Sequence, residues 1–365
     1  MRAKHKWYIG IAASIGLLCF SLTACVDLIE IETPIETAER KIVVQGLITD
    51  GPGPYDFSFF YTAARGRRQF DPFSPLEAYV RDDAGNEEAL EFVKPGEYVL
   101  PGSIIKGQIG QTYQLYFRSE NGAEYLSSEE TMQPGPKLDS IYAEVRYEEN
   151  AGGLDGLSAT LFRYIMRIYI DVDLSGNENS PLVRWDYQRW FRFTEPTQPD
   201  NPLFVPKSCF VFDTPTENRV AIFDGSQANG GKWQRQEVAA VLADFKFAEG
   251  SVVALTQYSL TDAGFNYWQK VDRVVNQTGT IFDSPPASIR GNISNVNDSY
   301  EEVLGYFQAS AVDTLFLRQN RQDLTSTVIP FCASANANFY FSGGNPCGNC
   351  LQIPNSTLEE PSFWN

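Results

Sequence analysis

The sequence is almost without histidine and has few basic residues for its length. It holds one histidine, His5, and 29 lysines and arginines against 46 aspartates and glutamates, which gives a net charge of −17. Such a chain repels phosphate backbones, which argues against nucleic acid as a partner. Because His5 lies in the first 24 residues, their removal leaves no imidazole and a net charge of −20, from 26 basic and 46 acidic residues. That excludes Ser-His-Asp and Cys-His catalysis and every histidine-ligated zinc site.

Beyond the N-terminus the sequence also lacks an apolar run long enough to span a membrane. Residues 1–24 combine a basic start with the apolar stretch Ile9–Leu22, which is typical of a signal peptide. The segment Leu22–Cys25 has the small residues and the thiol of a lipobox. We therefore predict lipidation at Cys25, anchoring in the outer membrane, and an acidic tether over residues 25–40. An ordinary signal peptide with an incidental cysteine is the alternative.

Residues 41–132 predict a small β-domain. Short segments with alternating apolar residues are separated there by turn signals such as Asp50–Pro54 and Asp83–Asn86. About seven short antiparallel strands favour an immunoglobulin-like or prealbumin-like sandwich. The run Gln133–Pro136 cannot lie in a central strand, so it marks the boundary of this domain.

Residues 137–365 predict a larger β-sandwich or barrel-like domain, and the strand expected at Val303–Phe307 is counted among its strands. One segment has helical periodicity: Thr261 is a candidate N-cap for a helix over Asp262–Gln277. Its apolar side chains share one face, so we expect this helix to cover an open sheet or barrel. The chain is thus expected to be mainly β.

Four cysteines follow Cys25 outside the signal segment, namely Cys209, Cys332, Cys347 and Cys350. In an oxidising compartment they predict two disulfides, for which three pairings are open. Cys347 and Cys350 form a Cys-x-x-Cys motif, but no helix follows it to lower a thiolate pKa, so structural bonds are favoured over redox or metal chemistry. Pairing each tail cysteine with Cys209 or Cys332 would attach the C-terminal segment to the second domain.

Two groups of residues are candidate contact sites. Arg65, Arg67 and Arg68 form a dense basic cluster in an acidic chain and suit an anionic glycan, lipopolysaccharide phosphates or an acidic partner. A solvated loop is the simpler interpretation. Trp190 and Phe191 are neighbours in a predicted strand, so one ring points outward, and Trp190 is a candidate for stacking against a ligand. Strand aromatics are, however, more often part of a core.

Several short motifs carry a family resemblance. They are Val44–Tyr55, Arg184-Trp185-x-Tyr187, Phe282-Asp283, Pro285-Pro286, Gly291-Asn292, Val303–Phe307 and the final Phe363-Trp364. Together with the late Cys-x-x-Cys, these motifs resemble a family of Bacteroidota lipoproteins called domain of unknown function 4249. The resemblance extends over nearly the whole mature chain. The acidic residues behind Cys25 also resemble signals for export to the cell surface.

The resemblance implies a partner more than an activity. Members of that family resemble partners of TonB-dependent outer-membrane receptors, and no catalytic residue is assigned in them. We therefore expect a non-catalytic lipoprotein, exposed on the cell surface, that assists such a receptor or binds its ligand. A structural or adhesive surface protein is the alternative, and a carboxylate-dependent glycan hydrolase is a third. No cofactor, metal or catalytic residue is expected.

Overall fold

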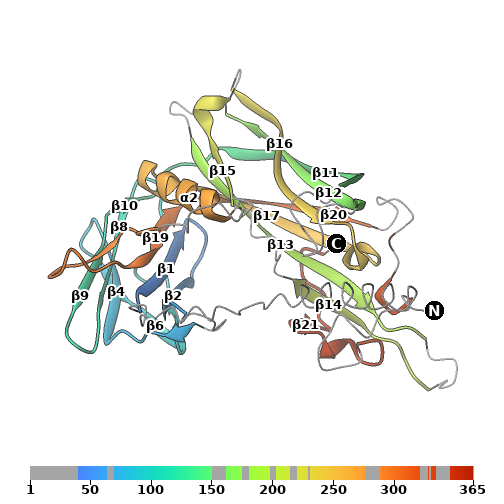
Figure 1. Ribbon diagram of the computed structural model, residues 1–365, viewed down its shortest axis with the longest axis horizontal. Coiled ribbons are helices and arrows are strands. Elements are labelled where there is room, and N and C mark those ends of the chain that lie inside the picture. Colours follow the sequence, from blue (N-terminus) through green and yellow to red (C-terminus); the bar gives the residue numbers. More distant parts are fainter. Residues whose placement is uncertain are drawn as a thin grey trace, which may run out of the picture. The chain divides into compact units, whose positions relative to one another are not determined.

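The computed structural model describes residues 40–364, apart from 64–69, 150–161, 175–180, 198–202, 214–219, 229–230, 276–287, 321–327, 329 and 334–345. Cys25 and the basic cluster Arg65, Arg67 and Arg68 therefore lie outside the described residues. Strands dominate the described part, which has one α-helix, α2 (Asp262–Val275), so the chain is mainly β as predicted (Figure 1). No helix in these described ranges is long and apolar enough to cross a membrane.

Two sheets form the first sandwich. One has the order β19 (Leu304–Ser310), β1 (Ile42–Thr49), β2 (Tyr55–Tyr61), β7 (Glu97–Leu100) and β6 (Glu91–Lys94), with β3 (Asp71–Pro72) beside β2. The other has the order β18 (Ile293–Asn295), β9 (Glu124–Ser127), β8 (Thr112–Arg118), β4 (Glu77–Asp82) and β5 (Glu87–Ala89), with β10 (Glu130–Thr131) beside β8.

The core of the first sandwich follows from alternation along its strands. In β8 the side chains of Tyr113, Leu115 and Phe117 are almost fully buried, while the residues between them are half-exposed. The Phe117 ring stacks on Tyr125 with centroids 4.6 Å apart and meets the Phe59 ring edge-on at 5.2 Å. Period-two patterning thus specifies one apolar face for each sheet, and the predicted sandwich is confirmed.

One late strand belongs to the first sandwich, although most strands of the second part precede it in the sequence. The strand expected at Val303–Phe307 is β19, which pairs with β1 in parallel, so it belongs to the first sandwich rather than to the C-terminal part. This pairing needs glycine at Gly305, where φ is 88° and a Cβ atom would lie 1.9 Å from the Val44 carbonyl oxygen. A parallel pairing between distant segments leaves no local signal in the sequence, which is why alternation alone could not place β19.

Two further open sheets make a second, sandwich-like part rather than a closed barrel. A three-stranded sheet has the order β11 (Lys137–Glu149), β12 (Phe162–Asp173) and β16 (Lys232–Leu242). The other sheet has the order β20 (Val312–Gln319), β17 (Ser251–Ser259), β13 (Leu182–Thr194), β14 (Ser208–Asp213) and β21 (Ser356–Thr357), with β15 (Ala221–Asp224) beside β13. Short 3-10 helices lie at Gly225–Gln227, Phe245–Phe247, Phe331–Ala333 and Cys350–Gln352.

Helix α2 begins at its predicted cap and contacts both parts. The backbone N–H of Gly264 donates to the Thr261 hydroxyl at 3.1 Å, as an N-cap requires. Trp268 lies under the Arg184 guanidinium of β13, 4.2 Å from its carbon to the ring centroid, and donates its indole N–H to the Gln308 side chain of β19 at 2.8 Å. The helix therefore covers a sheet, as expected, and also ties β13 to β19.

The four cysteines form two disulfides, Cys209–Cys350 and Cys332–Cys347. This is one of the three open pairings, and it joins each tail cysteine to an earlier one as expected. Around the bonds lies a small separate core that includes Phe193, Phe331 and Ile353. The C-terminal segment is thus attached covalently to β14.

We expect Gly305→Ala to lower the free energy of unfolding by at least about 2 kcal/mol more than Gly85→Ala. Both glycines have nearly the same φ, 88° and 86°, so both substitutions lose about 1–2 kcal/mol to the left-handed backbone. A Cβ at Gly85 meets nothing within 4 Å, whereas one at Gly305 meets the Val44 backbone. Urea unfolding measures the difference, and equal losses would contradict the close packing of β1 and β19.

The two disulfides are expected to differ in their effect on stability. Cys209–Cys350 closes a sequence separation of 141 residues and Cys332–Cys347 one of 15. Loop-closure entropy then makes the paired substitution Cys209→Ser with Cys350→Ser about 2 kcal/mol more destabilising than Cys332→Ser with Cys347→Ser. Urea unfolding of the two double variants tests this, and the reverse order would show that strain or local contacts outweigh chain entropy.

Candidate functional site

The outer surface of the three-stranded sheet carries a dense set of polar side chains. In β12 the side chains of Met166, Ile168 and Ile170 are fully buried in the core, so the alternate residues face away from it. We call this surface the polar face. It consists of Tyr142, Glu144, Arg146, Glu148, Arg167, Tyr169, Asp171, Arg235 and Glu237.

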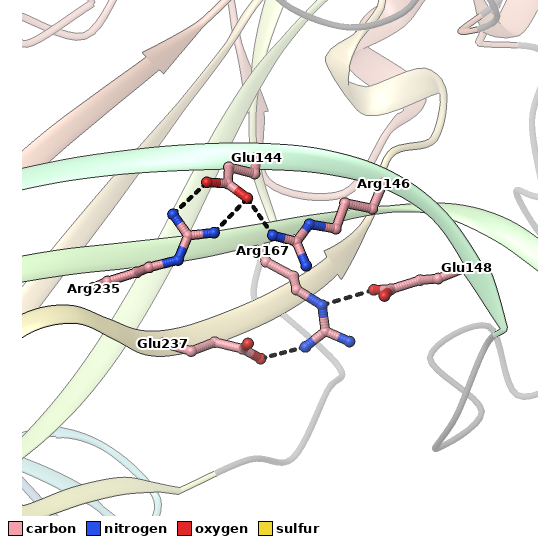
Figure 2. A network of polar contacts seen from close by, with 6 residues as sticks. All are labelled: Glu144, Arg146, Glu148, Arg167, Arg235 and Glu237. Carbon is pink, nitrogen blue, oxygen red and sulfur yellow. Dashed lines mark hydrogen bonds and ion pairs between the residues drawn. The ribbon is translucent and has the colours of Figure 1, made fainter.

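Arg167 lies between two carboxylates (Figure 2). Its Nε donates to Glu148 Oε1 and its Nη1 to Glu237 Oε1, both at 2.7 Å, so the central strand joins its two neighbours. All three side chains are about one-quarter to one-third exposed. The hydrogen bonds from Arg167, with Glu148 first, raise the pKa of its guanidinium further above the usual range. This first triad carries one net negative charge.

Glu144 lies between two guanidinium groups (Figure 2). It accepts hydrogen bonds from Arg146 Nη2 at 2.6 Å and from Arg235 Nη2 at 2.7 Å, and Arg235 Nη1 lies 2.5 Å from its second oxygen. The bonds from Arg235 and then Arg146 lower the pKa of Glu144 to about 2. This second triad carries one net positive charge, so the two triads balance in a chain of net charge −17.

A bulge in the edge strand β16 fixes Arg235 in this position. The backbone of Arg235 is left-handed, with φ of 55°, and its N–H donates to Asp171 Oδ1 at 2.7 Å. Its guanidinium carbon lies 4.6 Å from the centroid of the Tyr169 ring, which also stacks on Tyr142. The charged groups are therefore held before any ligand arrives. A non-glycine residue with positive φ is the kind of local strain that accompanies functional surfaces.

A second charged cluster is buried and internally balanced. Arg189, 3% exposed, donates to Asp213, and Lys246 Nζ lies 2.9 Å from the same carboxylate. Burial opposes ionisation of Asp213, yet Arg189 and Lys246 together lower its pKa. Burial raises the pKa of the nearby Asp244 against the same two cations. The cluster has two cations and two acids, which suits a structural role.

A third polar group, the Glu130 cluster, lies where the two parts meet. Glu130 is 2% exposed and accepts hydrogen bonds from the Tyr306 hydroxyl at 2.6 Å and from Thr261 Oγ1 and Asn292 Nδ2 at 3.1 Å each. Burial raises the pKa of Glu130 although these donors oppose the shift. The Glu130 carboxylate is already hydrogen-bonded by its neighbours, so the Glu130 cluster connects the two parts and is not suited to be a reaction centre.

The residues proposed from the sequence are not brought together in one site. Phe191 is buried on the core side of β13, and Trp190 points to the opposite side. The Trp190 ring packs there against Phe212 and Phe363, with ring centroids 5.0 Å and 4.7 Å away. Stacking of a ligand on Trp190 stays a prediction, as do the roles of Cys25 and the basic cluster. Within the described ranges, no group of three or more acidic, histidine or cysteine side chains is arranged to hold a metal ion.

The polar face is a surface that sequence reasoning missed. The sequence does contain a pattern that indicates such a face, namely the alternating polar residues Tyr142-x-Glu144-x-Arg146-x-Glu148 along β11. Arg167 and Arg235 come from other strands, and only the register of the sheet and the β16 bulge bring them beside these acids.

A family model described as domain of unknown function (DUF4249) matches residues 29–315. The chain belongs to this family. The resemblance inferred from the sequence motifs is thereby confirmed, and the match covers the first sandwich, most of the second part, the polar face and the Glu130 cluster, but not β21 or the end of β20. A comparison with curated proteins found no match. Family membership assigns neither activity nor ligand, so function is argued from the surfaces.

The Glu130 cluster predicts a pH dependence of stability. Folding raises the pKa of Glu130, so the folded chain binds this proton more tightly than the unfolded chain does. The free energy of unfolding therefore falls as the pH rises from the ordinary glutamate pKa through the raised one. Glu130→Gln removes the titration and flattens this part of the profile, as measured by urea unfolding between about pH 4 and pH 8.

Tyr306→Phe is the matched control for this prediction. It removes a donor that lowers the pKa of Glu130 and keeps the carboxylate, so the fall in stability extends to higher pH. Parallel pH profiles for the unmodified chain and Glu130→Gln would contradict the prediction.

Proposed function

We propose that this protein is a non-catalytic, lipid-anchored outer-membrane protein that binds a polar ligand on the cell surface in support of a TonB-dependent nutrient receptor. The observation that carries the binding part is the polar face, which is partly exposed, is fixed in shape and holds two triads of opposite net charge. A surface of this kind recognises a ligand without a large ordering cost. The anchor and the receptor rest on the lipobox at Cys25 and on the family resemblance.

The polar face favours binding over catalysis. A carboxylate pair for hydrolysis needs one acid that holds its proton near neutral pH. Glu144 is held ionised by two arginines, and Glu148 and Glu237 both pair with Arg167. Glu144 is therefore not suited to act as a general acid.

The face still has hydrogen-bonding capacity for a ligand. Arg167 uses Nε and Nη1, and within the described ranges its Nη2 has no protein partner. The second oxygens of Glu148 and Glu237 are likewise without a partner there. Since the charges of the two triads balance each other, the ligand class that fits best is neutral and rich in hydroxyl or amide groups, such as a glycan or a peptide.

Co-purification from outer membranes in gentle detergents tests the proposal. The unmodified chain is expected to bring down a TonB-dependent receptor, and Cys25→Ser, which removes the lipid acceptor, is expected to leave the membrane fraction. Recovery of the chain without any barrel partner in every detergent would count against the receptor and favour a structural or adhesive protein. Turnover of a glycan that is lost on carboxylate substitution would overturn the non-catalytic part.

Substitution within the polar face tests the ligand. Arg167→Gln removes the central cation of the first triad, and we expect nutrient uptake to fall while receptor co-purification persists. Arg118→Gln is the matched control, because Arg118 forms a comparable exposed pair with Glu77 in the first sandwich, 3.0 Å apart. Equal uptake by both variants would remove the polar face from the proposal.

A further inference from the structure

A short loop between β18 and β19 presents apolar side chains to solvent. We call residues Val296–Tyr300 the docking knob. The Tyr300 side chain is 93% exposed and the Val296 side chain 56% exposed. In Figure 1 the orange loop leading into β19 projects from the strands of the first sandwich. Because almost none of the Tyr300 side chain is buried, it adds nothing to the free energy of unfolding.

The docking knob is nevertheless held rigidly by its own polar groups. Asn295, 8% exposed, accepts hydrogen bonds at its Oδ1 from the backbone N–H groups of Asn297 at 2.8 Å and Asp298 at 3.1 Å. Asp298 Oδ1 accepts from the N–H of Tyr300 at 2.9 Å. The backbone that carries Tyr300 is thus fixed by two successive Asx turns.

The base of the docking knob is tied to the core of the first sandwich. Glu301 accepts from Asn295 Nδ2 at 2.6 Å and from the hydroxyl of Tyr125 at 3.0 Å, and Tyr125 is 2% exposed. Val296 also donates its N–H to the Glu124 carbonyl of β9 at 2.8 Å. These hydrogen bonds fix the shape of the loop, while the side chains of Tyr300 and Val296 stay exposed to solvent.

We propose that the docking knob inserts into an apolar socket, rimmed by basic groups, on a folded protein partner. Tyrosine is enriched among residues that dominate interface energy, and a loop that is already ordered loses little entropy on binding. Asp298 is the only charged residue in Val296–Tyr300. Arg290 Nη2 donates to the Ser299 carbonyl at 3.1 Å, but within the described ranges it forms no ion pair with the Asp298 carboxylate, which calls for a cation at the socket rim. The acidic segment Asp298–Glu302 disfavours an anionic lipid surface. This inference goes beyond the proposed function, because it does not require the partner to be a receptor.

Site-specific photo-crosslinking of the full-length chain in cells of its native host tests the docking knob. Tyr300→p-benzoylphenylalanine is compared with Leu203→p-benzoylphenylalanine, since Leu203 is equally exposed at 90% on a different loop. The expected result is an adduct with one protein from position 300 alone, at a peptide that contains lysine or arginine. Asp298→Asn keeps an acceptor for the Tyr300 N–H but removes the charge, so it should lower the adduct yield.

The partner identified in this way is then measured with purified proteins. Tyr300→Ala should raise its dissociation constant at least about tenfold and leave the unfolding midpoint unchanged, because the exposed ring stabilises nothing. Leu203→Ala should change neither quantity. The inference is overturned if position 300 gives no protein adduct, if both positions give the same adducts, or if the adduct is a lipid, a glycan or a second copy of this chain.

The outcomes also separate this inference from the proposed function. Absence of a protein adduct from position 300, while a receptor still co-purifies with the unmodified chain, overturns the docking knob and leaves the proposed function standing. A protein adduct from position 300, together with the absence of any receptor from the co-purification, supports the docking knob and counts against the receptor partnership.

Discussion

The parallel pairing of β1 with β19 is the constraint on which the joint between the two parts depends. It brings residues 304–310 back to the first sandwich after the chain has built most of the second. Two glycines permit it, because a Cβ at Gly305 would lie 1.9 Å from the Val44 carbonyl oxygen and one at Gly291 would lie 1.7 Å from that of Gly305. The side-chain amide of Asn292 then pairs with β19 as the backbone of a neighbouring strand would. Its Oδ1 accepts from the N–H of Phe307, and its Nδ2 donates to the Phe307 carbonyl. Only with β19 in place does Tyr306 reach Glu130.

The same pairing extends into a buried polar network that joins the parts. Ser310 donates its hydroxyl to the Ser259 carbonyl, and Ser259 donates its own to the Gln133 carbonyl, both at 2.6 Å. Gln257 donates to the Pro136 carbonyl at 2.5 Å and accepts from the Trp185 indole at 3.1 Å. Such groups are costly to bury unless they are paired, so a hinge opening here would leave several of them unsatisfied. The connection around Gln133–Pro136 is therefore part of a hydrogen-bonded joint, although its proline and glycine content is typical of a flexible linker.

Local patterns explain what was predictable from the sequence. Alternation specifies the apolar faces of strands such as β8, and the Thr261 hydroxyl marks the start of α2. With four cysteines available, only three ways of pairing them into two disulfides are possible. The placement of β19 and the assembly of the polar face were not predictable, since both depend on register between distant strands. Arg235 shows this most clearly: it joins Glu144 only because a bulge in β16 turns its backbone to a φ of 55°.

The positions that carry the family resemblance are mostly scaffold positions. Gly305 and Tyr306 build the joint, Asp50 accepts from the N–H of Val312 at the start of β20, and Arg184 holds Trp268 of α2. The polar face lies outside the motif positions that carry the resemblance, whereas the docking knob lies between Gly291-Asn292 and Val303–Phe307, within the stretch that carries most of it. These motif positions therefore account for how the two sandwiches are joined, and they do not identify a ligand or a partner. Under the proposed function, a ligand found for another member would transfer to this chain only if that member also has the paired triads on its three-stranded sheet.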